Sequence, residues 1–199
     1  MTAQGVNTVA LRLPDGPGPV DLDAHAFTVL GDALLAGDRW NADQLGTVLG
    51  WAGRITGPYL LWEAHDGGLV DQTALAAHIG MVWSRTEFPD AALGHDRWRE
   101  LWHAAGFTRD GHPAAQPAAP MELWRGSVPE RRTDWSWTTD RTVAEEYAAG
   151  GFRRKAGRLY RTFAPAGALL GAYNGRGEGE YVIDTRGLAI IEHEGEGRG

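Results

Sequence analysis

Residues 135–148 read WSWTTDRTVAEEYA, and the spacing of apolar side chains changes in the middle of this stretch. Its first residues alternate between apolar and polar side chains, which is typical of a strand. Thr139 or Asp140 can then cap the exposed amides at the start of a helix. The buried stripe of that helix is expected to contain Val143, Ala144, Tyr147 and Ala148. The stretch therefore predicts a strand that leads directly into a helix over residues 140–149.

Short strand-like runs surround this unit, whereas helical spacing dominates the earlier half of the chain. The strands are expected at residues 122–125, 135–138, 158–163, 168–172, 180–184 and 188–192. The earlier helices are expected at residues 26–36, 43–53, 73–83 and 95–105, and a hairpin is possible over residues 9–13 and 19–22. This pattern predicts an α+β protein.

Four regions follow from this change of character. Residues 1–111 form a mainly helical N-terminal region, and residues 112–120, HPAAQPAAP, form a Pro/Ala-rich connection. Prolines lack backbone donors and disfavour helix in the residues before them. Residues 121–192 form the strand-rich core, and residues 193–199 form a flexible tail.

Composition narrows the possible functions. The 199 residues are 43% hydrophobic and 23% charged, with a formal net charge of −7, so general affinity for nucleic acid or anionic membranes is not expected. The absence of cysteine excludes disulfides and thiolate chemistry, and the histidines lack metal-ligand spacing, so we expect no metal. With neither a signal peptide nor a long apolar run, we expect a cytoplasmic protein, or one delivered into a target cell's cytoplasm by a non-classical route.

Three short motifs in the second half carry reactive side chains. Residues 123–126 read LWRG and place Arg125 at the end of a short apolar strand. Ser136 lies in the strand before the helix. Residues 178–184 read EGEYVID and bring two alternating glutamates, Glu178 and Glu180, into a late strand. Each motif alone is only weak evidence for a particular kind of site. Their occurrence in this order, on strands and with a helix directly after the second, is more specific.

In this order the motifs resemble the arginine–serine–glutamate (R-S-E) class of toxin-like mono-ADP-ribosyltransferases, whose last motif has the form ExE. The resemblance covers about residues 121–191. It implies a split β-sandwich core that binds NAD as a co-substrate, and transfer of ADP-ribose to a target macromolecule with release of nicotinamide. The sequence leaves the biological role open between a toxin or effector and a phage or bacterial regulator of host proteins.

The resemblance assigns a role to each residue of the trio. Breaking the bond between nicotinamide and ribose passes through an oxocarbenium-like transition state, which a nearby carboxylate stabilises. That carboxylate corresponds to Glu180, and Ser136 corresponds to the serine that orients it. Arg125 corresponds to the arginine that holds NAD phosphate and ribose through its forked donors.

Further residues are implied as NAD-binding by their positions beside these motifs. Gly126 would let the backbone approach the nicotinamide amide, because it lacks a Cβ. Trp137 and Thr138 accompany Ser136 in the second motif. The remaining set lies in a loop after the helix and consists of Phe152, Arg153 and Arg154.

Glu178 bears on the choice of acceptor. In the family, glutamate at this position accompanies modification of arginine. Alternation along a strand would place Glu178 and Glu180 on one face, where Glu178 could orient a guanidinium nucleophile. We therefore expect a protein arginine as acceptor and consider a nucleic acid acceptor less favoured.

Two alternatives remain open. The chain could be an NAD glycohydrolase with water as acceptor, which would not depend on Glu178. It could also be an inert NAD-binding or protein-interaction module, in which Arg125 is a surface residue and the glutamates belong to a solvated loop.

Overall fold

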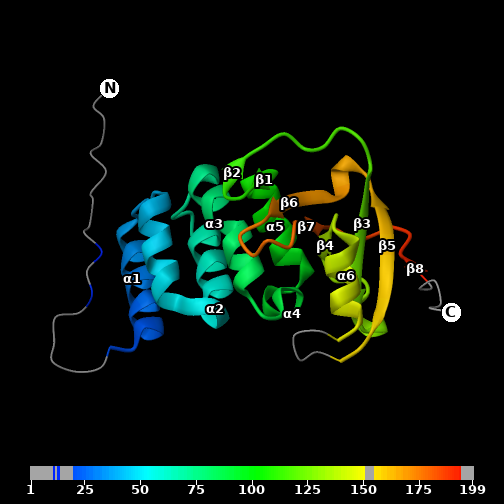
Figure 1. Ribbon diagram of the computed structural model, residues 1–199. Helices are drawn as coiled ribbons and strands as arrows, with labels where there is room; N and C mark the ends of the chain where they lie inside the picture. Colours follow the sequence, from blue (N-terminus) through cyan, green and yellow to red (C-terminus); the bar gives the residue numbers. More distant parts are fainter. Residues whose placement is uncertain (1–10, 12, 14–19, 151–154, 194–199) are drawn as a thin grey trace. The chain divides into compact units, whose positions relative to one another are not determined.

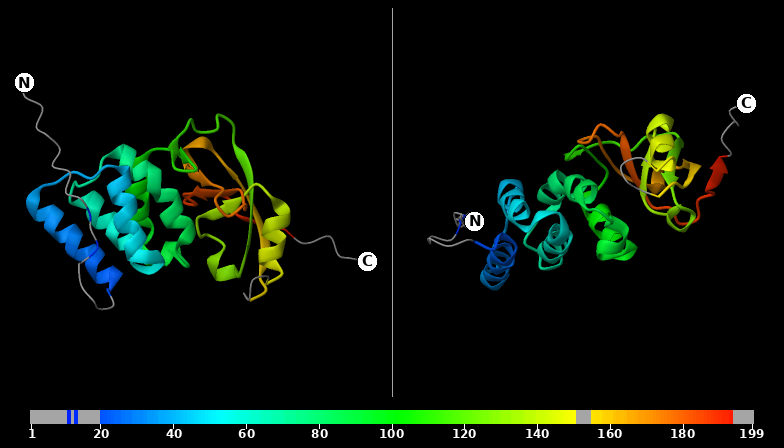
Figure 2. Two further views of the ribbon diagram at one scale, coloured as in Figure 1. Left: turned by 60° about the vertical axis from the view of Figure 1, so that its left-hand side comes forward. Right: turned by 60° about the horizontal axis from the view of Figure 1, so that its bottom comes forward.

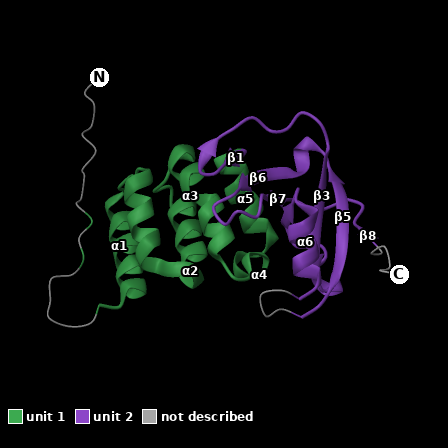
Figure 3. Ribbon diagram, viewed as in Figure 1, with its two compact units in different colours: residues 1–106 green, residues 107–199 purple. Residues whose placement is uncertain are grey.

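The computed structural model describes residues 11, 13, 20–150 and 155–193. It divides into two compact units, residues 1–106 and 107–199, which are coloured separately in Figure 3. The helices of the first unit and the sheet of the second confirm a mixed α+β protein (Figure 1). The boundary lies at Gly106 rather than at residue 111, because strand β1 (Thr108–Arg109) already belongs to the sheet.

The first unit is built from helices whose N-termini are capped by side chains. Asp21, Asn41 and Asp71 each accept a backbone N–H from the first turn of the following helix, which satisfies donors that the helix itself cannot pair. The first three helices pack in chain order, the fifth packs on the third, and the short fourth helix packs on the second and fifth. Figure 2 shows them from two further directions. They are α1 (Leu22–Ala36), α2 (Ala42–Asp66), α3 (Gln72–Arg85), α4 (Pro89–Leu93) and α5 (His95–Ala105).

Tryptophan rings form the centre of this helical unit. Trp83 of α3 is fully buried and meets Trp98 and Trp102 of α5 edge-on, with ring centroids 4.9 and 6.4 Å away. Edge-to-face contacts of this kind are favourable for aromatic pairs. Trp98 and Trp102, four residues apart on α5, therefore belong to the core of this unit.

Helix α2 extends beyond the predicted segment 43–53 and is kinked at Gly53, where that segment was expected to end. Gly53 has φ +67° and ψ −169°, values outside the helical region, and the chain then resumes a helix that contains Pro58. Beside the kink lies a cavity of about 320 Å³ whose lining includes Arg54 and Arg85. The predicted hairpin is wrong at Leu22, which begins α1; residues 9, 10, 12 and 19 of the hairpin lie outside the described part of the chain.

The second unit is an eight-stranded sheet with the order β2-β1-β6-β7-β4-β3-β5-β8. All pairs are antiparallel except β1 with β6. Two-residue strands β1 and β2 were not predicted, and β2 uses the first two residues of the expected connection. The remaining strands are β2 (His112–Pro113), β3 (Met121–Ser127), β4 (Ser136–Thr138), β5 (Arg158–Ala164), β6 (Leu169–Tyr173), β7 (Glu180–Ile183) and β8 (Ile191–His193).

Helix α6 (Arg141–Ala148) follows β4 as predicted, and Asp140 caps it by accepting from Thr142 N and Val143 N. It packs on β3, where Trp124, Ala144 and Leu159 form a small buried cluster. A larger cluster contains Leu123 of β3 and Tyr160 of β5, which are the chain neighbours of Trp124 and Leu159. Alternation along the strands therefore gives the sheet two buried faces.

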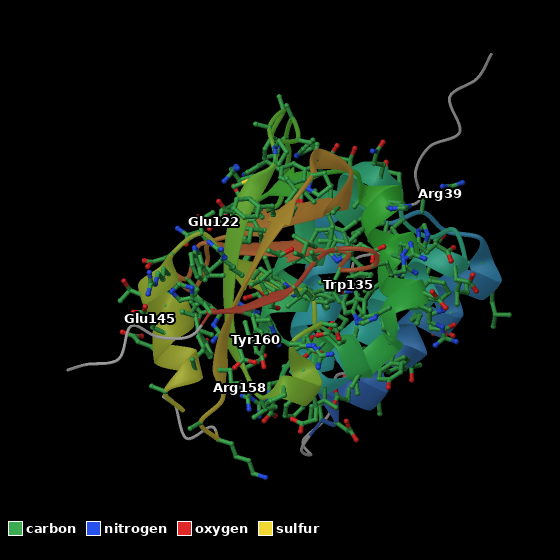
Figure 4. The ribbon with its side chains drawn as sticks, turned by 90° about the vertical axis from the view of Figure 1, so that its right-hand side faces the viewer. Arg39, Glu122, Trp135, Glu145, Arg158 and Tyr160 are labelled. Atoms are coloured by element: carbon green, nitrogen blue, oxygen red, sulfur yellow. The ribbon has the colours of Figure 1, made fainter. Side chains whose placement is uncertain are left out.

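Strand β5 carries a buried tyrosine next to an exposed ion pair, and Figure 4 labels Tyr160 and Arg158 on this strand. Burial raises the pKa of the Tyr160 hydroxyl, and the nearby Glu192 carboxylate adds to the shift. Arg158 donates to both Glu192 oxygens at 2.8 Å, and this hydrogen bond raises the pKa of its guanidinium. The pair links β5 to the edge strand β8.

Candidate active site

Ser136 and Glu180 meet on one face of the sheet. The register of β4 and β7 pairs Thr138 with Glu180 and Ser136 with Val182, so Ser136 and Glu180 are diagonal neighbours on the same face. Ser136 Oγ donates to Glu180 Oε1 at 2.6 Å. Glu180 is only 8% exposed, so a carboxylate lies in a largely desolvated place with a fixed orientation. The predicted contact between these two residues is present.

Arg125 reaches the same segment through main-chain contacts. Strands β3 and β4 pair only at Trp124 and Thr138. Beyond that pair, Arg125 Nη1 donates to the Ser136 carbonyl at 2.5 Å and its Nε donates to the Arg131 carbonyl at 3.0 Å. The guanidinium thus replaces strand pairing where β3 and β4 separate. Arg125 holds the backbone of Ser136 in this structure, which is a positioning role in addition to the predicted phosphate contact.

Asp134 completes this arrangement and was not identified from the sequence. Its Oδ2 accepts from Arg125 Nη2 at 3.1 Å and from Arg131 Nε at 2.6 Å. The side chains of Asp134 and Arg125 are 14% and 12% exposed, so the pair is poorly hydrated and its charge-assisted bonds are strong. The sequence signal was weak, since Asp134 sits in a polar loop, RRTDW, whose charges look like an ordinary solvated turn.

Two of the predicted NAD-binding residues serve the protein itself. Trp137 is 2% exposed, belongs to the larger buried cluster, and donates from Nε1 to the Asp134 carbonyl at 2.8 Å. Thr138 Oγ1 donates to the Glu178 carbonyl at 2.7 Å and accepts from Asp140 N at 2.9 Å. Trp137 therefore belongs to the core, and Thr138 ties the loop before β7 to the start of α6.

The packing of α6 gives a reason for glycine at position 126 that was not predicted. A Cβ at this position would lie 2.0 Å from the Ala144 carbonyl oxygen and 2.3 Å from Ala148 N. The space that glycine leaves is filled by the backbone of α6, because that helix lies directly on β3. The close approach seen here is between helix and strand, and the approach of nicotinamide to the Gly126 backbone stays a prediction.

Glu178 lies before strand β7, so the expected alternation of the two glutamates on one strand face is not found. Strand β7 begins at Glu180, and Gly179 between them has φ +54°, so the alternation rule does not apply to Glu178. Its Oε1 accepts from Tyr147 Oη of α6 at 2.7 Å and from Arg176 Nη2 at 2.9 Å. Tyr147 was predicted only as part of a buried helix stripe, and Arg176 was not singled out.

No family model, curated protein or solved structure matches this chain. Its function is therefore inferred from the side chains that the sheet brings together. Those side chains are a buried carboxylate with one hydroxyl donor, an arginine that anchors the adjoining loop, and a second carboxylate that binds a guanidinium.

The predicted residues Phe152, Arg153 and Arg154 lie outside the described residues, between Gly150 and Lys155. In the described ranges 20–150 and 155–193, no group of three or more His, Asp or Glu side chains is arranged to hold a metal ion. The helices described in those same ranges are all too short or too polar to cross a membrane.

The buried Glu180 carboxylate, held by Ser136, is suited to stabilising positive charge. A carboxylate fixed in a poorly hydrated place interacts strongly with a cation that develops beside it, because little solvent has to reorganise. The hydroxyl of Ser136 fixes the orientation of the Glu180 carboxylate. Cleavage of a bond at a sugar anomeric carbon is the kind of reaction that uses such a carboxylate.

Proposed function

We propose that the second unit is the catalytic part of an NAD-dependent mono-ADP-ribosyltransferase. The observation that carries the proposal is the 2.6 Å hydrogen bond from Ser136 Oγ to the 8% exposed carboxylate of Glu180. Support also comes from the order of the three motifs. The arginine of the first motif, Arg125, binds the carbonyl of Ser136 in the second. NAD is the co-substrate and nicotinamide is the leaving group.

Glu180 is the proposed catalytic residue. As the bond between nicotinamide and ribose lengthens, positive charge grows on the sugar, and the Glu180 carboxylate stabilises that charge. Ser136 is a positioning residue, because it acts on the sugar through Glu180. Arg125 has the same positioning role for the backbone of Ser136, and we propose that it also contributes positive charge toward NAD phosphate.

The proposed acceptor is a protein arginine. Glu178 binds a guanidinium in this structure, that of Arg176, at 2.9 Å, so its carboxylate suits the group that the acceptor would supply. The Glu178 side chain is 23% exposed, and an acceptor arginine would bind there in place of Arg176. Charge-assisted bonds of this kind orient a guanidinium and hold one nitrogen as a nucleophile. The proposed partners are therefore NAD and a target protein.

The decisive experiment incubates the chain with labelled NAD and a cell lysate and measures both nicotinamide release and transfer of label. Glu180→Gln keeps an oxygen that can accept from Ser136 but removes the charge, so we expect nicotinamide release to fall by about 10²–10³-fold, as for other lost electrostatic contacts in transition states. Glu146→Ala, an exposed carboxylate on α6, is the matched control and should keep full activity.

The outcomes separate the candidate functions. Absence of nicotinamide release from the native chain would overturn the enzyme and leave the inert NAD-binding or interaction module. Label on nucleic acid would overturn the arginine acceptor and leave the transferase.

NAD hydrolysis is the second candidate, favoured by the fact that Arg176 already occupies the Glu178 carboxylate. Water would then be the acceptor. Glu178→Ala separates the two reactions, because hydrolysis should survive this change while transfer to arginine should fall.

A further inference from the structure

An arginine of the chain itself occupies the carboxylate that the proposed reaction assigns to the acceptor. Arg176 Nη2 lies 2.9 Å from Glu178 Oε1 and 3.4 Å from Tyr147 Oη, while Tyr147 Oη also donates to the same glutamate oxygen at 2.7 Å. Glu178 therefore receives two donors on one oxygen, from α6 and from the turn before β7. The pair is more than a chance contact between mobile surface charges.

The turn that carries Arg176 is held at both ends. Gly177 N donates to the Asn174 carbonyl at 2.8 Å, and Gly179 N donates to Asn174 Oδ1 at 2.9 Å. Gly177 and Gly179 both have positive φ, which only glycine adopts without strain, so the turn depends on the glycines in the sequence NGRGEG. Arg176 is consequently presented from an ordered turn.

Thr138 connects this turn to the candidate active site. Its hydroxyl donates to the Glu178 carbonyl at 2.7 Å, and in the strand register it lies directly opposite Glu180. Only Gly179 separates Glu178 from Glu180 along the chain. The guanidinium of Arg176 is therefore bound to a residue that Thr138 and Gly179 link to the carboxylate that would stabilise the ribosyl cation. The Arg176 side chain is 48% exposed, which leaves room for substitution on nitrogen.

We infer that Arg176 is a self-modification site, which takes ADP-ribose from NAD within the same chain. This inference rests on the proposed transferase function. A terminal nitrogen of Arg176 forms a bond to the ribose anomeric carbon, the bond from that carbon to nicotinamide breaks, and nicotinamide leaves with the bonding electron pair. The nitrogen loses one proton, which the Glu178 carboxylate accepts and passes to water. No oxidant or reductant is needed.

The test incubates the full chain with labelled NAD and maps the label by mass spectrometry. Native protein should gain one ADP-ribose on Arg176, at a rate that does not change on dilution, because donor and acceptor groups belong to one molecule. Arg176→Lys keeps the positive charge and should lose this label. Arg186→Lys is the matched control, since Arg186 also pairs at 2.9 Å with a carboxylate two residues away, Asp184, and should keep the label.

Agmatine, a small free guanidine, is added in a parallel reaction to separate failure of the inference from failure of the proposed function. If agmatine is labelled while the chain is not, self-modification is wrong and the transferase stands. Label that persists in Arg176→Lys, or a labelling rate that rises with protein concentration, also overturns the inference. If no nicotinamide is released with or without agmatine, the proposed function and the inference both fail.

Discussion

Replacing Gly126 by alanine tests how closely α6 is seated on β3. The new Cβ would lie 2.0 Å from the Ala144 carbonyl oxygen and 2.3 Å from Ala148 N, whereas ordinary contacts begin at about 3.4 Å. The helix would have to withdraw by about 1.4 Å, the difference between 3.4 and 2.0 Å. Both obstructing groups are backbone, so no side-chain rotation can relieve the contact. Withdrawal would also separate fully buried Ala144 from Trp124.

Overpacking of this severity costs about 3 kcal/mol or more of unfolding free energy. Each kcal/mol corresponds to roughly 4–8 °C in a domain of this size, so the second unit should melt roughly 12–24 °C lower. Near-UV circular dichroism during a thermal ramp measures the change. The control is Gly167→Ala, because a Cβ there meets no atom within 4 Å and should leave the Tm unchanged or slightly higher. If Gly126→Ala melts like Gly167→Ala, the packing described for α6 on β3 is wrong.

Three further predictions concern the candidate site and its support. Ser136→Ala removes a charge-assisted hydrogen bond worth about 1.5–3 kcal/mol, so nicotinamide release should fall roughly 10- to 150-fold. The Tm should change less than in Gly126→Ala. Unchanged turnover would remove Ser136 from the mechanism. Arg125→Lys cannot reproduce the forked contacts and should lower the unfolding free energy in urea by about 1–3 kcal/mol, with no loss counting against its anchoring role. The raised pKa of Tyr160 means that the folded state keeps its proton when the unfolded state loses it, so stability is fully present below pH ~10 and declines as the pH rises further; a Tyr160→Phe variant should show a shallower decline in alkaline unfolding curves.

Sequence periodicity predicted the main elements of both units and missed different features in each. The strand-to-helix stretch was found almost as expected, because its capping residue Asp140 and its apolar stripe act locally. Helix α2 was cut short at residue 53, because Gly53 and Pro58 are ordinarily signals that end a helix. Tertiary packing overrides them by turning the break into a kink. Strands β1 and β2 are too short to show any period.

The candidate site was predicted where order along the chain was enough and missed where spatial contacts decide. The pairing of Ser136 with Glu180 follows from two neighbouring strands that the motifs identified. The strand alternation expected for Glu178 and Glu180 was wrong, because one left-handed glycine, Gly179, breaks it and its conformation cannot be recognised from residue type alone. The roles of Asp134 and Tyr147 depend on loops and a helix folding back toward the strands, which no local pattern encodes.

The sheet has a narrow seam at β4, which is three residues long and joins β7 to β3 through a single residue pair on the β3 side. Side-chain hydrogen bonds add to the pairing of β4 on both sides: Arg125 links β3 to β4, and the Ser136–Glu180 bond links β4 to β7. The residues proposed for chemistry therefore also hold the two halves of the sheet together. Alanine variants of this trio are therefore poor inactive controls in cells, since a lost phenotype could report reduced protein abundance as readily as lost turnover. Glu180→Gln keeps an oxygen that can accept from Ser136, so it is the variant to use in cells.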